Sequence, residues 1–172
     1  MKTVKLHNNA QPFVNYLQKR YRNDRGALAN LKGGLSAARK PNAWPLLAGF
    51  EGAIGNSAYE TVAALWASDP ALDCHEGSLG NALARIKTEN NSFEGRFKRL
   101  LTCERDEIAE RIIPVVRAAQ AKGISINYAQ LLSDLLWWND IVKVEWAKAF
   151  WGAVEPDEAI NPDLLDKEEV LA

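Results

Sequence analysis

Apolar residues recur every three or four positions along most of the chain, from position 9 to position 151. This spacing places them on one face of a helix, whereas a strand needs alternation at every second residue. The clearest example is 127–138, where Tyr128, Leu131 and Leu135 share a face. Neither the Val/Ile/Thr alternation nor the paired glycine turns of strands occur. The sequence therefore predicts an all-α fold, a compact single-domain helical bundle of roughly eight to nine helices.

Polar caps and breakers divide this pattern into helices. Asp24, Ser57 and Asp106 are placed to cap helices, and Glu60, three residues after Ser57, has capping-box spacing. Pro114 should kink its helix or split it in two. The expected helices span 9–23, 24–35, 44–54, 57–68, 78–87, 92–105, 106–123, 127–138 and 140–152.

The chain of 172 residues is 47% hydrophobic, which suits one folded domain over residues 1–152. Residues 153–172 contain two prolines and little periodicity, and we expect a separate, mobile acidic tail there. No apolar run approaches 18 residues, and the N-terminus lacks the apolar stretch of a signal peptide. A cytoplasmic protein is the default expectation.

Charge is distributed unevenly, although the net charge is only −1. Residues 1–40 hold nine Lys or Arg and one acid, whereas residues 41–84 hold five acids and no base. Residues 85–117 hold eight bases and six acids, and residues 153–172 hold one base and seven acids. If the basic residues meet on one face of the fold, a polyanion is the natural partner.

Few residues are suited to catalysis or metal binding. Neither a phosphate-binding glycine loop nor a GxSxG nucleophile motif is present, and the two histidines are His7 and His75. Cys74 and His75 would need further ligands to hold zinc, and no regular spacing links them to Cys103. We therefore expect no enzyme activity, no catalytic residue, no metal site and no cofactor.

The segment from Ser92 to Arg105 combines an apolar stripe with basic residues. Phe93 and Phe97 lie on one helix face, while Arg96 and Arg99 share a flank. Two interpretations remain open from these residues: an amphipathic helix with solvated charges, or a surface that holds an anion. The six tryptophans likewise fit core packing or, beside basic residues, base stacking.

The runs at 77–108 and 127–150 resemble the CasB family, the small subunit of the type I-E CRISPR Cascade surveillance complex. The N-terminal run DRGALANLK, residues 24–32, looks like the opening signature of that family. The matching positions are Ser78-Leu79-Gly80, Ala82-Leu83, Arg96 to Leu101, Arg105, Tyr128, Leu131-Leu132, Asp134-Leu135, Trp137-Trp138, Trp146-Ala147 and Phe150.

The resemblance implies a non-catalytic, all-helical subunit. Two copies would lie between the large subunit and the backbone subunits that carry guide RNA. Their basic residues would form a groove for target DNA and the displaced strand of an R-loop. The positions that match the family's basic surface are Lys32, Arg96, Arg99 and Arg105, with Arg25 and Arg39 as additions.

This hypothesis predicts that Lys32, Arg96, Arg99 and Arg105 share one solvent-facing groove. The alternative is a protein-interaction adaptor that docks through its Trp-rich C-terminal helices, with scattered basic residues and an exposed aromatic patch. The acidic tail, which the resemblance does not cover, would compete with nucleic acid for the groove.

Overall fold

The computed structural model describes residues 5–87 and 92–152, and within them the chain is helical. The α-helices are α1 (Ala10–Tyr21), α2 (Arg25–Gly33), α3 (Trp44–Leu47), α4 (Ser57–Ser68), α5 (Leu79–Lys87), α6 (Ser92–Leu101), α7 (Ile108–Arg111), α8 (Ile113–Ala121), α9 (Tyr128–Leu136) and α10 (Asp140–Trp151). Two short 3-10 helices, η1 (Lys40–Asn42) and η2 (Pro70–Leu72), connect them.

The expectation of an all-α bundle is confirmed. Eight of the α-helices have nine residues or more, and α3 and α7 are single turns of four residues. In the described part of the chain no strand forms, and Asp73 and Ile126 make only an isolated parallel bridge. None of the described helices is long and apolar enough to cross a membrane. The acidic tail expected at 153–172 lies outside the described residues.

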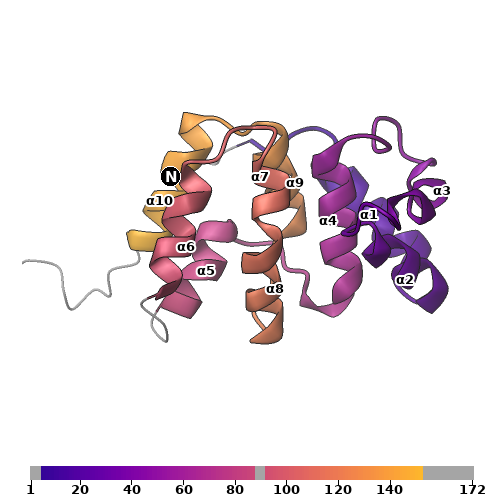
Figure 1. The fold of residues 1–172 in the computed structure, drawn as a ribbon, viewed down its shortest axis with the longest axis horizontal. Helices are drawn as coiled ribbons and strands as arrows, with labels where there is room; N and C mark the ends of the chain where they lie inside the picture. The colour runs from indigo at the N-terminus through magenta and orange to yellow at the C-terminus, as the bar shows by residue number, and fades with distance from the viewer. Residues whose placement is uncertain (1–4, 88–91, 153–172) are drawn as a thin grey trace, which may run out of the picture.

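The longer helices stand side by side along the long axis of the molecule (Figure 1). One end holds α1, α2 and α3, the middle holds α4, α9, α7 and α8, and the other end holds α5, α6 and α10. Helix α2 packs on α4, α5 packs on α10, and α9 contacts both α1 and α4. The described chain is therefore a row of helices with α4 near its centre.

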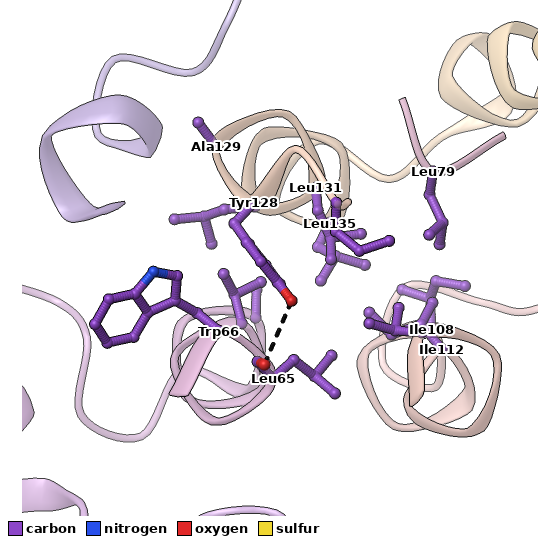
Figure 2. Close-up of a cluster of buried hydrophobic side chains, with 14 of the residues drawn as sticks. Leu65, Trp66, Leu79, Ile108, Ile112, Tyr128, Ala129, Leu131 and Leu135 are labelled. Atoms are coloured by element: carbon purple, nitrogen blue, oxygen red, sulfur yellow. Dashed lines mark hydrogen bonds between the residues drawn. The ribbon is translucent and has the colours of Figure 1, made fainter. Parts of the chain in front are cut away.

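Helix α4 is enclosed by its neighbours, because nine of its twelve residues are buried. Its inner face packs against α9, where Tyr128 points toward α4 and its hydroxyl donates to the carbonyl oxygen of Leu65 at 3.4 Å (Figure 2). Gln120 of α8 donates to that same oxygen at 2.7 Å. The hydrogen bonds satisfy polar groups that would otherwise be costly to bury.

Helix starts agree with the sequence prediction in part. The Asp24 side chain accepts the backbone N–H of Ala27, as expected for a cap. The cap assigned to Ser57 is wrong, because Asn56 accepts the N–H of Ala58 and Ser57 is already helical. Asp106 caps nothing, since α7 begins two residues later, after Glu107, without a side-chain cap.

Several helices are shorter than their apolar pattern suggests. The stretch expected at 44–54 is helical only to Leu47, and Gly52 and Gly55 then adopt positive φ angles of 82° and 79°. Helix α2 ends at Gly33 instead of 35, and α9 ends at Leu136 instead of 138. Pro114 does split its helix, into α7 and α8.

Two close contacts fix α10 against the bundle. Asp134 of α9 is buried, and its carboxylate accepts Trp146 Nε1–H at 2.7 Å and Gln130 Nε2–H at 2.8 Å. Burial raises the pKa of Asp134 to about 6, although both hydrogen bonds act in the opposite direction. At Gly80 of α5, an added Cβ would overlap the carbonyl oxygen of Trp146, so glycine permits this close approach.

We expect Gly80→Ala to lower the free energy of unfolding by about 1–3 kcal/mol, because α5 and α10 must separate to admit the methyl group. Gly95→Ala is the matched control, since Gly95 is also helical and its Cβ would meet nothing within 4 Å. The control should raise the unfolding free energy by about 0.5–1 kcal/mol. Urea unfolding measures both, and equal effects would contradict the close approach.

The raised pKa of Asp134 predicts a pH dependence of stability. Between the ordinary value of 3.8 and about 6, the folded state binds more protons than the unfolded state, so stability falls as pH rises. We expect the unfolding free energy of the wild type, relative to Asp134→Asn, to fall by about 2–3 kcal/mol from pH 4 to pH 7. Urea titrations at several pH values test this, and a constant difference would contradict it.

Candidate nucleic-acid interface

Helix α6 holds two arginines at the surface. Phe93, Phe97 and Leu100 are buried and fix its inner face to the bundle, and Phe97 stacks on Phe150 of α10 with ring centroids 4.0 Å apart. This leaves Arg96 and Arg99 exposed on one flank of the helix. The amphipathic helix expected at this position is therefore present, with both arginines facing away from the core.

Arg96 and Arg99 line a cleft of about 800 Å³ between α6 and the start of α8, called the α6 cleft below. The lining also contains Arg111, at the end of α7, which the sequence analysis did not select. The sequence did not indicate a binding role for Arg111, because arginines and acids alternate in this stretch, a pattern typical of a solvated helix face. The full lining is Arg96, Arg99, Leu100, Thr102, Cys103, Asp106, Glu107, Glu110, Arg111, Pro114 and Val115.

The three arginines of the α6 cleft form no ion pair with any residue in the described part of the chain. Three acids line the same cleft, so the cleft as a whole is not strongly positive. One of them is already engaged, because Glu107 Oε2 accepts the backbone N–H of Glu104 at 3.1 Å. Arg96 and Arg99 on one wall thus keep their hydrogen-bond donors available for an external anion.

The lining of the α6 cleft includes the thiol of Cys103. Burial, followed by the nearby Glu107 carboxylate, raises the pKa of the Cys103 thiol, which disfavours a reactive thiolate. Across residues 5–87 and 92–152, no group of three or more His, Cys, Asp or Glu side chains is placed to hold a metal ion. Besides its three acids, the cleft presents the guanidinium groups of Arg96, Arg99 and Arg111, which are suited to binding an anion.

Arg105 lies elsewhere. It donates through Nη2 to the carbonyl oxygen of Leu136 at 2.5 Å, so it satisfies a carbonyl group at the C-terminal end of α9. It also lines a separate, smaller cavity of about 90 Å³, together with Asn56 and Ile108. Arg105 therefore has a structural contact that Arg96 and Arg99 lack.

Arg25, Lys32 and Arg39 form a second basic group, called the α2 surface below. Arg25 and Lys32 are exposed on α2, and Arg39 follows the end of that helix. An added Cβ on Gly33 would lie 3.4 Å from both Cβ and Nε of Arg39, so the Arg39 side chain lies against the end of α2 at Gly33. None of the three forms an ion pair within the described residues.

The structure does not bring the predicted basic residues onto one cleft. Arg96 and Arg99 share the α6 cleft, Arg105 lines another cavity, and Lys32 belongs to the α2 surface. Helices α2 and α6 lie toward opposite ends of the long axis, with α4 and α8 between them (Figure 1). A single copy of the chain therefore presents two separate basic surfaces.

Most tryptophans belong to the core. Trp66, Trp138 and Trp146 are buried, and Trp138 donates through Nε1 to the carbonyl oxygen of Cys103 at 2.9 Å. Trp137 is 41% exposed and packs against His7 with ring centroids 5.0 Å apart. Trp44 is 38% exposed on a different element. Core packing, rather than a broad aromatic face, thus accounts for most of these rings.

Fold and surface together define a class: an all-helical domain that presents exposed, ion-pair-free basic side chains. Comparison with known proteins makes the class specific. The sequence profile of the protein family described as CRISPR-associated protein Cse2 matches residues 24–151 of this chain. The chain is 35% identical to a CRISPR-associated protein Cse2 of Thermus thermophilus over 108 residues, covering 59% of this chain and 60% of that relative's length.

Solved structures agree with this match. A Cse2-family protein of Thermus thermophilus superposes with a TM-score of 0.68 at 29% identity, covering 84% of this chain and 98% of the other. CasB of the same species gives 0.69 at 28% identity, with 86% and 100% covered. CasB of M. ruber gives 0.66 at 25% identity, with 96% and 99% covered. The chain belongs to the CRISPR-associated Cse2 family, whose members are also named CasB.

Because Arg105 contacts Leu136, we expect Arg105 to contribute to the stability of the fold, whereas Arg96 and Arg99 should not. Arg105→Ala should lower the free energy of unfolding by about 1 kcal/mol, because a carbonyl at the end of α9 loses its charged donor. Arg96→Ala and Arg99→Ala, the matched controls, should each change it by less than about 0.5 kcal/mol. Urea unfolding distinguishes them, and equal stability of all three variants would refute a structural role for Arg105.

Proposed function

We propose that the chain is the non-catalytic small subunit of a CRISPR Cascade surveillance complex, where it holds the target and displaced DNA strands and so stabilises the R-loop. The family assignment supports the complex, since Cse2 proteins are structural subunits of Cascade. The observation that carries the DNA-holding role is that Arg25 and Lys32 on α2, and Arg96 and Arg99 on α6, are exposed and make no ion pairs within the described residues.

Physical chemistry favours such residues for an R-loop. Formation of an R-loop exchanges one duplex for another of similar stability, so modest contacts to phosphates shift the balance. A displaced strand needs a positive surface more than it needs readout of its bases. Arginine suits this task because its planar guanidinium can bind phosphate through two hydrogen bonds.

The separation of the two basic surfaces favours a role that requires more than one copy. Within one chain, the central helices separate the α2 surface from the α6 cleft (Figure 1). A second copy placed beside the first would set the α2 surface of one copy near the α6 cleft of the other. The pair would then offer DNA a longer positive path, in the cytoplasm and in contact with the large subunit, the backbone subunits and their guide RNA.

A protein-interaction adaptor remains the second candidate, and two observations favour it. The basic residues lie on separate surfaces, as this alternative predicts, and apolar side chains are exposed. Trp137, Ile141 and Val144 are 41%, 69% and 50% exposed at the C-terminal end of the described chain. Such side chains are common at protein interfaces. A subunit of a larger complex also needs protein contacts, so exposed apolar side chains fit both candidates. The two candidates differ in whether the function depends on the exposed arginines.

Replacing Arg96 and Arg99 together by Ala should destabilise the R-loop of a reconstituted Cascade, whatever the target sequence. R-loop dissociation would be followed over a range of salt concentrations. The loss of two phosphate contacts should make the slope of log K against log salt concentration, for single-strand binding, shallower by about 1–2. Replacing Arg25 and Lys32 should act in the same direction, because the α2 surface contributes to the same path.

The charge-matched control is Lys143→Ala with Lys148→Ala on α10, which removes two positive charges outside both basic surfaces. This control should leave the salt slope unchanged. Co-purification of every variant with guide RNA and the other subunits checks that the complex still assembles. Normal assembly and normal R-loop stability in the Arg96/Arg99 variant would argue against DNA holding and for the adaptor.

A further inference from the structure

The described chain ends at Trp151 and Gly152, and Trp151 packs on α6. The acidic residues 153–172, called the acidic segment below, follow in the sequence. The last residue of α10, Trp151, packs its ring against that of Phe97 in α6, with centroids 5.2 Å apart. Lys98 Nζ lies 6.0 Å from the centroid of the Trp151 ring. A positive charge of α6 therefore lies close to the point where the acidic segment starts.

The outer face of α6 carries cations from that point to the α6 cleft. Successive helix residues are about 100° apart, which sets Lys98, Arg99 and Arg96 in this order around the exposed side. Gly95 falls between Lys98 and Arg99, and a Cβ there would meet no atom within 4 Å. Lys98 and Arg99 thus flank open space at Gly95, and Arg96 lies on the far side of Arg99.

These cations are available to an anionic segment. Lys98 pairs with Glu94 at 2.9 Å, but this pair is exposed and contributes little to stability. Arg96 and Arg99 form no ion pair among the described residues. The acids of the α6 cleft, which come from the side of α7, repel an acidic chain from its interior. The outer face of α6 is therefore a better place for such a chain than the bottom of the cleft.

The acidic residues 153–172 are opposite in net charge to residues 1–152, and they are close enough in sequence to Gly152 to reach α6. Residues 153–172 hold seven acids and one base, whereas residues 1–152 hold 20 bases and 15 acids. The first acid, Glu155, is three residues beyond Gly152, a reach of about 10 Å when extended. That is comparable with the diameter of one helix, about 10–12 Å. The first acids of the segment can thus reach Lys98 and Arg99 without passing around the molecule.

We propose that the acidic segment docks on the outer face of α6, against Lys98, Arg99 and Arg96, and competes there with nucleic acid. This proposal rests on the DNA-holding function proposed above. A tethered segment acts at an effective concentration on the order of 1 mM, so even weak docking lowers the apparent affinity for DNA. It would suppress binding of the free subunit to unrelated nucleic acid, and the aligned phosphates of an R-loop would displace it.

The test uses the full-length chain with the seven acids of the segment replaced by their amides: Glu155→Gln, Asp157→Asn, Glu158→Gln, Asp163→Asn, Asp166→Asn, Glu168→Gln and Glu169→Gln. Binding of a labelled single-stranded DNA at low salt should become at least about threefold tighter. The gain should disappear when Arg96→Ala and Arg99→Ala are added, and it should shrink at high salt. The charge-matched control, with Lys143→Ala and Lys148→Ala added instead, should retain it.

A second readout needs no DNA. The side-chain Nε–H NMR signals of Arg96 and Arg99 should differ between the wild type and the amide variant, whereas that of Arg25 should not. Unchanged arginine signals and unchanged affinity, in a protein whose DNA binding still depends on Arg96 and Arg99, would overturn the docking proposal alone. Shifted arginine signals with no DNA binding by either protein would support docking and contradict the proposed function.

Discussion

The enclosure of α4 is the constraint on which the rest of the bundle depends. Nine of its twelve residues are buried, and four of those are alanines, which let neighbouring helices approach closely. Helices α2, α7, α8 and α9 all pack on it. A helix that is apolar on every side must be covered on every side. Covering α4 places α2 on one side and α8 on the other, and so separates the two basic surfaces.

The residues that carry the family resemblance are mainly residues of packing. Asp134 and Trp146 form a buried hydrogen bond between α9 and α10, and Gly80 permits α5 to approach α10. Tyr128 and Trp138 are buried and hydrogen-bonded to carbonyl oxygens. Motifs of this kind identify a fold reliably because each residue satisfies a specific contact. They say less about function, which depends on exposed residues that packing does not constrain.

The sequence predicted the helices well and the surface poorly, for a physical reason. Helix periodicity and caps such as Asp24 are local, so they can be found without knowledge of the fold. The glycines at 52 and 55 instead favoured a turn over the expected helix. The last helix is apolar on nearly all sides, which from the sequence fits either burial on two sides or a partner surface; Ile141 and Val144 are in fact exposed, whereas α4 is enclosed. The grouping of Arg111 with Arg96 depends on tertiary packing and could not be read from spacing.

A chain with separated basic surfaces and near-neutral total charge is suited to act within an assembly. Each exposed arginine adds only a modest, salt-dependent contribution to phosphate binding. In the function proposed above, two or three such contacts on one copy would give weak affinity, so a free subunit would not bind nucleic acid indiscriminately. When the copies and the other subunits hold several basic surfaces along one strand, the contributions combine through high effective concentration. In the function proposed above, retention of DNA depends on correct assembly, because the basic residues of one copy are divided between two surfaces.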